Sequence, residues 1–264
     1  MGRKLMAEEV LTTQRLNDVL ILTLNRPEAL NALNPALMLA IEAFGRSMLS
    51  DPARVLVIRG AGRHFCAGAD LKAPASDASL VQRRRDAQLG GRMLRAIIDI
   101  PQVTIAAVHG AALGGGLCIP TACDFRIAAD TAIGGYPEVN LGMNLMWQSV
   151  GLCTRLVGPA RAKRMIMLGE RLDAQTLLSW GLWDEAVPEE QLMPRAQALA
   201  DRYAAQPPIA VQMIKQTINQ ISGALDQAIL HMDADQNLLT GSSQDRALGI
   251  QGFLAGTAPT FTGD

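Results

Sequence analysis

Hydrophobic and polar positions in the first part of the chain follow the short periods of β-strands. The runs VLTTQRL (10–16) and VLILTLN (19–25) flank Asn17-Asp18, a dipeptide that favours a two-residue turn, so they predict a hairpin. Asn34-Pro35 predicts the start of a helix that continues through ALMLAIEAFGRSML. The run VLVIRG (55–60) is almost wholly apolar, which is typical of a strand covered on both faces.

The alternation of strand and helix continues to about residue 135. A polar, alanine-rich stretch and a long helix at roughly 79–99 are expected before the apolar strand VTIAAVHG (103–110). A short helix is expected after the glycines at 114–116, followed by the strand FRIAAD (125–130). An order of βαβα indicates a sheet with helices packed on it, so the predicted fold class is α/β.

Beyond residue 143 the pattern is almost all helical, with one short strand expected around Trp183–Val187. We expect a core at 1–200 and a helical C-terminal region at 201–264. Such a region packs either on a neighbouring subunit or on its own chain. Apolar residues recur at helical spacing in it: Ile209, Met213, Ile214, Ile218, Ile221, Leu225 and Ile229.

The composition and charge of the chain argue against several classes of function. The 264 residues carry a formal net charge of -1, which gives no electrostatic reason to expect nucleic acid or an anionic membrane as a partner. No apolar run reaches the ~18 residues of a membrane span, and the start MGRKLMAEEV lacks the apolar middle of a signal peptide. The four cysteines form no CxxC pair, so we expect reduced, buried thiols in a cytoplasmic protein.

Two glycine-containing loops are the main candidates for chemistry. HFCAGADLK (64–72) and GAALGGGLC (110–118) each follow a predicted strand, where open α/β sheets place their ligands. Gly68 can adopt a positive φ and expose the amide of Ala69, and the glycines at 114–116 leave amides unpaired at a helix start. Two such amides on one oxygen would form an oxyanion hole. The alternative is that these glycines only permit close packing of helix on sheet.

Other familiar site motifs are absent from the sequence. It contains no GxxxxGK[ST], no GxGxxG and no GxSxG, so phosphate-loop, dinucleotide-binding and serine-hydrolase sites are not predicted. His231 and Asp235 are expected to share one face of a helix. We expect that face to be solvated rather than to bind a metal ion. The run Arg83–Arg85 is likewise expected on a solvated helix face. We therefore predict no metal.

The combination of FCAGADL, AAVHGAALGGGL, CDFRIAAD and YPEVNLG resembles the enoyl-CoA hydratase/isomerase (crotonase) superfamily. The likeness extends from LNRPEALNAL (24–33) to WGLWDEAVP (180–188) and covers nearly the whole chain. It implies a spiral of ββα turns with a C-terminal helical region used in trimerisation, as a homotrimer or a dimer of trimers. It also implies an acyl-CoA thioester substrate, with coenzyme A carried as part of the substrate and no other cofactor.

The resemblance also implies roles for individual residues. The amides of Ala69 and Gly115 would form the oxyanion hole, and Glu138 would be the catalytic acid or base. Lys72 and Arg26 are candidates for the nucleotide phosphates, and Tyr136 is a further candidate for substrate contact. The implied substrate and CoA contacts are Arg26, Ala67, Gly68, Ala69, Asp70, Leu71, Lys72, Gly114, Gly115 and Tyr136.

Cys118 occupies the position at which hydratases of the family place their first glutamate. One carboxylate with an oxyanion hole suffices for a proton shift, so isomerisation of a 3-enoyl-CoA is the favoured prediction. The alternative reaction is hydration of a 2-enoyl-CoA, either weak or assisted by Cys118. The alternative from another class of function is a protein that binds acyl-CoA without catalysing a reaction. The segment 143–147 forms either a bulky acyl pocket or core. The tail FLAGTAPTF lacks the basic residue that relatives often carry there.

Overall fold

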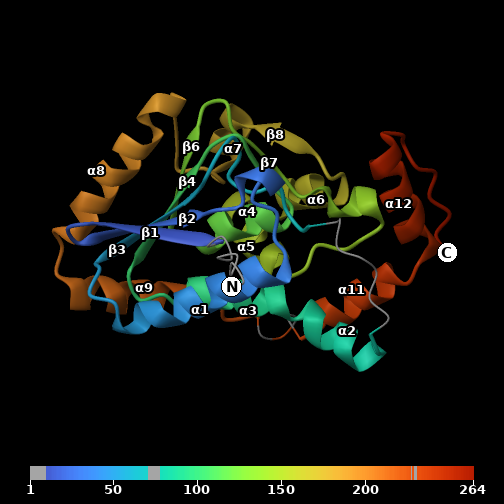
Figure 1. Cartoon of the computed structure of the whole chain (residues 1–264), viewed down its shortest axis with the longest axis horizontal. Coiled ribbons are helices and arrows are strands. Elements are labelled where there is room, and N and C mark those ends of the chain that lie inside the picture. Colours follow the sequence, from blue (N-terminus) through green and yellow to red (C-terminus); the bar gives the residue numbers. More distant parts are fainter. Residues whose placement is uncertain (1–9, 71–77, 227, 229–230) are drawn as a thin grey trace, which may run out of the picture.

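A computed structural model describes residues 10–70, 78–226, 228 and 231–264. Its central sheet has six strands in the order β1-β2-β3-β4-β6-β9, parallel except for the β1–β2 pair (Figure 1). The strands are Leu11–Leu16 (β1), Val19–Leu24 (β2), Val55–Gly60 (β3), Val103–Val108 (β4), Phe125–Ala129 (β6) and Glu185–Val187 (β9). The predicted hairpin at 10–25 and the buried strands at 55–60, 103–110 and 125–130 are confirmed.

A second, three-stranded sheet was not expected from the sequence. It consists of β5 (Ala111–Leu113), β7 (Ile133–Gly135) and β8 (Arg171–Asp173), with β5 parallel and β8 antiparallel to β7. Each strand has three residues, too few to show a period, and alanine and glycine give little strand propensity. This sheet matters for the site because β5 leads into the glycines and β7 leads into Pro137 and Glu138.

Helices cover the sheets. The long helix expected at 79–99 is wrong as a single element, because it is two helices separated at Gln88. The first has no buried residue, whereas the second buries Met93, Leu94 and Ile97 on its inner face. The α-helices before residue 205 are Pro35–Ser47 (α1), Leu80–Ala87 (α2), Leu89–Ile98 (α3), Gly115–Ala122 (α4), Ser149–Val157 (α5), Pro159–Met167 (α6), Ala174–Trp180 (α7) and Leu192–Ala204 (α8).

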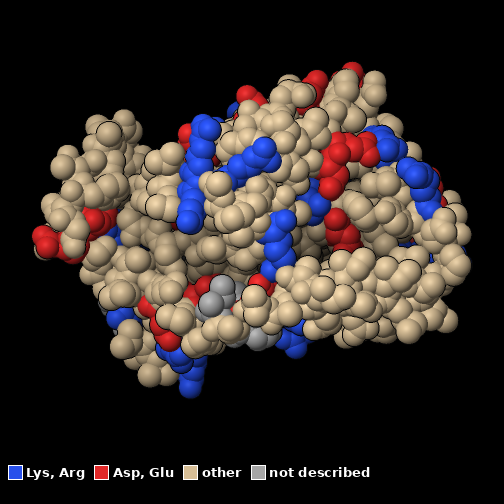
Figure 2. All heavy atoms as spheres, turned by 180° about the vertical axis from the view of Figure 1, so that it is seen from behind, with Lys and Arg blue, Asp and Glu red and all other residues tan. Residues whose placement is uncertain are grey.

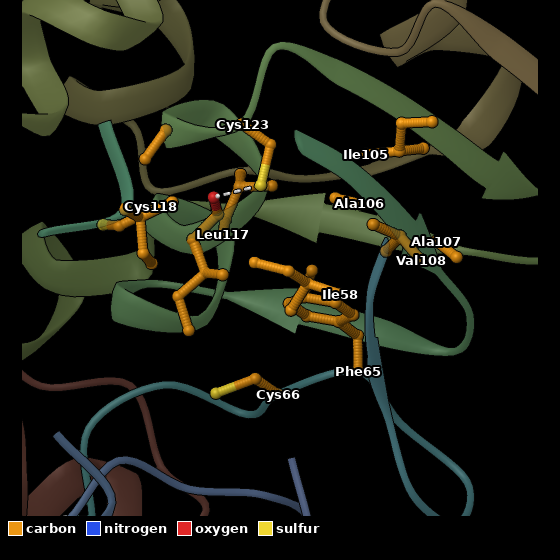
Figure 3. Packing of buried hydrophobic residues seen from close by; sticks show 14 of the residues in the cluster. Ile58, Phe65, Cys66, Ile105, Ala106, Ala107, Val108, Leu117, Cys118 and Cys123 are labelled. Carbon is orange, nitrogen blue, oxygen red and sulfur yellow. Dashed lines mark hydrogen bonds between the residues drawn. The ribbon is translucent and has the colours of Figure 1, made fainter. Parts of the chain in front are cut away.

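The part of the chain that the structure describes also contains four short 3₁₀ helices: Pro27–Ala29 (η1), Met48–Ser50 (η2), Pro137–Leu141 (η3) and Glu189–Gln191 (η4). The capping signal at Asn34 is confirmed, since its side chain accepts a hydrogen bond from the Leu37 amide at 2.9 Å. Residues of β3, β4 and α4 meet in the apolar core, which also holds Cys66, Cys118 and Cys123 (Figure 3). All four cysteines are free and buried.

The C-terminal region is helical, as predicted. It contains α9 (Pro208–Ser222), α11 (Asp233–Gly241) and α12 (Gln244–Ala255), which run from one end of the molecule to the other (Figure 1). The expected boundary between residues 200 and 201 falls inside α8, and the division into two domains stays a prediction. Ile229 lies outside the described residues. No described helix is long and apolar enough to cross a bilayer.

Helix α9 turns its polar residue Lys215 inward and its apolar residues outward. The Lys215 ammonium group lies 2.7 Å from Asp124 Oδ2 and donates to the Gln102 carbonyl at 2.7 Å. The surface over α9 carries no blue or red of charged side chains in the rear view (Figure 2). Five apolar residues of α9 and Leu225, just beyond its end, are each more than half exposed; those of α9 are Ile209, Met213, Ile214, Ile218 and Ile221.

Candidate active site

One pocket of about 450 Å³ lies where the two glycine loops meet η3. The loops come from the carboxyl ends of β3 and of β4 with β5, where the sequence places ligands. The structure brings seven of the predicted site residues into its lining: Ala67, Gly68, Ala69, Gly114, Gly115, Cys118 and Glu138.

The two glycine loops are held side by side by backbone hydrogen bonds. The Cys66 amide donates to the Ala111 carbonyl at 3.0 Å, and the Leu113 amide donates to the Cys66 carbonyl at 3.1 Å. Gly68 has a φ of +101°, and a Cβ atom there would lie 2.8 Å from the Leu113 carbonyl oxygen. Only glycine permits this approach. The same Cβ position is 3.8 Å from the Gly115 nitrogen, which places the Ala69 and Gly115 segments next to each other.

The amides of Ala69 and Gly115 are unpaired among the described residues. Gly115 is the first residue of α4, so its N–H has no acceptor within the helix. Around Ala69, the Leu33 amide donates to the Gly68 carbonyl and the Asp70 amide donates to the Leu33 carbonyl, a pattern that leaves the Ala69 N–H unused. Both residues line the pocket, so it contains two backbone donors on adjoining loops.

Glu138 projects from η3 against the start of α4. A Cβ atom at Gly114 would lie 2.5 Å from Glu138 Oε1, so the carboxyl group rests on the glycine. The other oxygen, Oε2, is buried and has no partner among the described residues. Burial raises the pKa of Glu138 to about 7, against a small lowering by its own backbone amide. At neutral pH this group can therefore both accept and deliver a proton.

Cys118 is a neutral thiol in this environment. It is fully buried, and its Sγ donates to the Gly114 carbonyl at 3.3 Å. Burial and the negative charge of Glu138 hold the pKa of Cys118 well above its usual value, while a hydrogen bond with Ser149 acts in the opposite direction. Among the described residues of the lining, Glu138 is the only carboxylic acid.

Other predicted contacts lie away from the lining. The Arg26 guanidinium donates to the Ala32 carbonyl and lies 3.3 Å from Asp70 Oδ2, so both side chains are engaged within the fold. Tyr136 is fully buried, and its hydroxyl lies 3.4 Å from Thr121 Oγ1. The predicted contact of Tyr136 with substrate stays a prediction, and the buried position of this side chain outside the pocket lining argues against it. Leu71 and Lys72 lie outside the described residues.

The pocket also contains residues that the sequence did not single out. Arg171 comes from β8, and Phe253, Thr257 and Pro259 come from α12 and the tail that follows it. No local sequence pattern predicts these four residues as part of the site, because tertiary packing brings them to the pocket. A Cβ atom at Gly249 of α12, for example, would lie 2.6 Å from the Leu141 carbonyl carbon. Residues 143–147 all line the pocket, which agrees with the alternative of a bulky pocket wall.

No group of three or more metal-binding side chains occurs among the residues that the structure describes. His231 is exposed, and Asp235 pairs with Arg84 at 2.5 Å rather than with a histidine. Arg84 is exposed on α2, and its ion pair with Asp235 links this helix to α11. The predicted solvated face at Arg83–Arg85 is therefore confirmed for exposure, but one of its arginines also makes a tertiary contact.

Comparisons with known proteins agree with this geometry. The family model for enoyl-CoA hydratase/isomerase matches residues 14–264. The chain is 34% identical to a crotonyl-CoA hydratase of Syntrophomonas wolfei over 252 residues, 94% of this chain and 96% of the relative. It is also 34% identical to a 1,2-epoxyphenylacetyl-CoA isomerase of Escherichia coli over 253 residues, 93% of this chain and 95% of the relative.

The fold shows the same relationship. The crystal structure of an enoyl-CoA hydratase from Mycobacterium avium subsp. paratuberculosis superimposes with a TM-score of 0.86 at 27% identity, covering 96% of this chain and 98% of the other. The α/β core and the helical C-terminal region are thus those of the crotonase fold. The chain belongs to the enoyl-CoA hydratase/isomerase family, the crotonase superfamily of acyl-CoA enzymes.

Proposed function

We propose that the protein moves the double bond of a 3-enoyl-CoA thioester to the 2-position, with Glu138 as the single acid and base. The observation that carries the proposal is the isolation of the Glu138 carboxyl group. It has a pKa raised to about 7, lies against Gly114, and shares the described lining with no second acid.

The proposed reaction uses three groups of this chain. Glu138 removes a proton from C2, and the electron pair moves into a dienolate whose oxygen accepts hydrogen bonds from the Ala69 and Gly115 amides. Glu138 then returns the proton at C4, so the double bond between C3 and C4 becomes one between C2 and C3. Two fixed donors stabilise the developing charge without reorganisation, and one such donor typically contributes about 10²- to 10³-fold in rate.

Hydration of a 2-enoyl-CoA is the second candidate, and the names of several relatives favour it. Crotonyl-CoA hydratase and 2,3-dehydroadipyl-CoA hydratase are each 34% identical to this chain. Hydration requires a positioned water and a proton for C2 as well as a base. The neutral thiol of Cys118, which donates to the Gly114 carbonyl, offers no second base for that water.

Coenzyme A enters this proposal as part of the substrate, and we propose no metal or further cofactor. The proposed assembly is a homotrimer or a dimer of trimers. It is supported by the five exposed apolar residues of α9 together with Leu225 just beyond it, which form a larger contiguous apolar surface than scattered single residues would. A cytoplasmic location stays a prediction from the cysteines and the N-terminal sequence.

The test compares 3-enoyl-, 2-enoyl- and β-oxoacyl-CoA thioesters as substrates for the wild type and two variants. Glu138→Gln keeps the size of the side chain but cannot accept the proton. Glu190→Gln makes the same change at an exposed site on η4. We expect the first variant to lose about 10²- to 10⁴-fold in 3-enoyl-CoA turnover and the second to match the wild type. Full activity of Glu138→Gln would exclude Glu138 as the base.

A further inference from the structure

The indole of Trp147 is inserted between helices α3 and α4. A Cβ atom at Gly90 of α3 would lie 2.0 Å from Trp147 Cε2, and one at Gly115 of α4 would lie 2.4 Å from Trp147 Cζ3. Real side chains essentially never come so close, so the indole fits only because both helices present glycine to it. The ring is well enclosed, with the residue only 9% exposed.

The backbone at Trp147 is held in an uncommon conformation. Trp147 has a φ of +64° and Gln148 a φ of +65°, and neither is the glycine or asparagine that usually adopts this region. The Gln148 amide donates to Asp233 Oδ2 of α11 at 2.8 Å, and Ser149 Oγ donates to the Trp147 carbonyl at 3.3 Å. Such strain persists only where the surroundings impose it, and it is found preferentially at functional sites. The turn therefore fixes the direction of the indole.

Trp147 lines the pocket together with Cys118, Leu145 and Met146. We call these four residues, a buried thiol and three apolar side chains, the apolar end of the pocket. The indole Nε1 is buried and has no hydrogen-bond partner among the described residues. A buried tryptophan ordinarily finds a partner for this N–H, so what the indole contributes among the described residues is apolar bulk.

Trp147 lies beside one half of the proposed oxyanion hole. Its ring packs against Gly115, whose amide is the proposed donor to the thioester oxygen, so an acyl chain that extends from this carbonyl toward Trp147 runs into the indole. The lining also includes Phe253, Thr257 and Pro259, which belong to α12 and the tail that follows it.

We propose that Trp147 is the residue that limits the acyl chain, and that Gly90 is the position that makes room for it. The preferred substrates are short-chain acyl thioesters. This inference rests on the proposed function for its choice of substrate, and it assigns the apolar end of the pocket to the acyl group rather than to coenzyme A.

The test measures kcat/KM for butenoyl-, hexenoyl-, octenoyl- and decenoyl-CoA. Trp147→Ala removes the wall, Trp147→Phe shortens it, and Gly90→Leu combined with Trp147→Ala refills the space from α3. Trp180→Phe is the matched control, because Trp180 lies on α7 outside the lining and stacks with Arg161 and Arg164. Phe253→Ala tests whether the chain runs toward α12 instead.

We expect the wild type to favour butenoyl-CoA and Trp147→Ala to raise the octenoyl-to-butenoyl ratio by about tenfold or more, because four additional methylenes gain apolar contact. Trp147→Phe should give a smaller rise, the double variant should return the ratio toward the wild-type value, and Trp180→Phe should leave it unchanged. An unchanged ratio in folded Trp147→Ala and Trp147→Phe would overturn the proposal. So would a wild type that uses decenoyl-CoA as well as butenoyl-CoA, or a rise in Phe253→Ala alone.

Binding of saturated acyl-CoA thioesters separates this inference from the proposed reaction. Butanoyl- and octanoyl-CoA are titrated calorimetrically into each variant, which requires no turnover. A shift toward octanoyl-CoA in Trp147→Ala supports the role of Trp147 even if no 3-enoyl-CoA is isomerised. Equal relative affinities in the wild type and Trp147→Ala contradict it even if isomerisation proceeds as proposed.

Discussion

Glu138 rests directly on Gly114, with a carboxyl oxygen 2.5 Å from the position that a Cβ atom of residue 114 would occupy. Two features produce this contact. Gly114 has a φ of +53°, and its amide donates to the Gly135 carbonyl at 2.8 Å, which joins the start of α4 to the strand that precedes η3. The same glycine turn thus presents the Gly115 amide and seats the carboxyl group beside it.

Gly114→Ala should damage the site more than the fold. The new methyl group must displace the Glu138 carboxyl, and alanine at a φ of +53° and a ψ of −128° costs about 1–3 kcal/mol. We expect a loss of roughly 10²-fold in kcat, since a shift of this size misplaces the base. Gly91→Ala on helix α3 is the matched control, because a Cβ atom there would have no described residue within 4 Å. This variant should stabilise the protein by about 0.5–1 kcal/mol. Equal activity of the two variants would contradict the role of the contact.

The raised pKa of Glu138 predicts a pH-dependent effect on stability. With a folded-state pKa near 7 and an ordinary value near 4.5, the unfolded state releases the proton first. Stability due to this group is therefore complete below about pH 4.5 and is lost as the pH rises through 7. Glu138→Gln removes this loss of stability, which is on the order of 3 kcal/mol.

The measurement is the difference in Tm between Glu138→Gln and the wild type at pH 5 and at pH 8. We expect the variant to be more stable by a clearly larger margin at pH 8. Glu190→Gln, at an exposed site, should show no such trend. A margin that is the same at both pH values would mean that Glu138 is not desolvated in the folded protein.

Cys118 should be dispensable for isomerisation. Its thiol is buried and its pKa is held well above the usual value, so no thiolate is present to act as a base. We expect Cys118→Ala to keep 3-enoyl-CoA turnover within about fivefold of the wild type, since no general-base contribution of 10² or more is lost. A loss of that larger size, in a variant that folds, would revive assistance by the thiol.

Cys118→Glu is the companion variant. A second carboxyl group beside Glu138 supplies the missing partner for water, and the mutual repulsion of two acids raises the pKa of one of them. We expect crotonyl-CoA hydration to increase by about tenfold or more if the absent acid limits this reaction. No increase in a folded variant would mean that other parts of the pocket prevent hydration.

The apolar face of α9 predicts self-association. Ile214 and Ile218 are each more than half exposed on this helix. Charges at both positions would be buried in the proposed homotrimer, so Ile214→Glu with Ile218→Glu should shift the mass measured by light scattering to that of a monomer. Leu49→Glu alters an equally exposed apolar residue on η2 and should leave the mass unchanged. A monomeric wild type would contradict the proposed assembly.

The sequence predicted the elements whose patterns are long enough to read. The hairpin at 10–25 and the helix at Asn34 have local signals, and the apolar strands at 55–60 and 103–110 stand between turns. The three-residue strands β5, β7 and β8 carry no period, and the two helices in 79–99 share one continuous helical pattern. Their positions depend on packing rather than on local propensity.

The site likewise contains features that the sequence predicts and features that depend on tertiary packing. Both glycine loops follow strands, and their convergence could be predicted from the rule that places ligands at the carboxyl ends of strands. The contact between Glu138 and Gly114 depends on the unpredicted sheet of β5 and β7. The left-handed turn at Trp147 could not be predicted, since an aromatic residue rarely adopts it, and Arg171 and Phe253 reach the pocket only through tertiary packing.

The central claim is that one carboxyl group, Glu138, carries the proton from C2 to C4. It is tested most directly by following the label from a 3-enoyl-CoA deuterated at C2 into the 2-enoyl-CoA product of the wild type and of Glu138→Gln. We predict that the wild type transfers a measurable fraction of the deuterium to C4 and that Glu138→Gln forms product at least about 10²-fold more slowly. Formation of the 2-enoyl product by Glu138→Gln at the wild-type rate would contradict the claim.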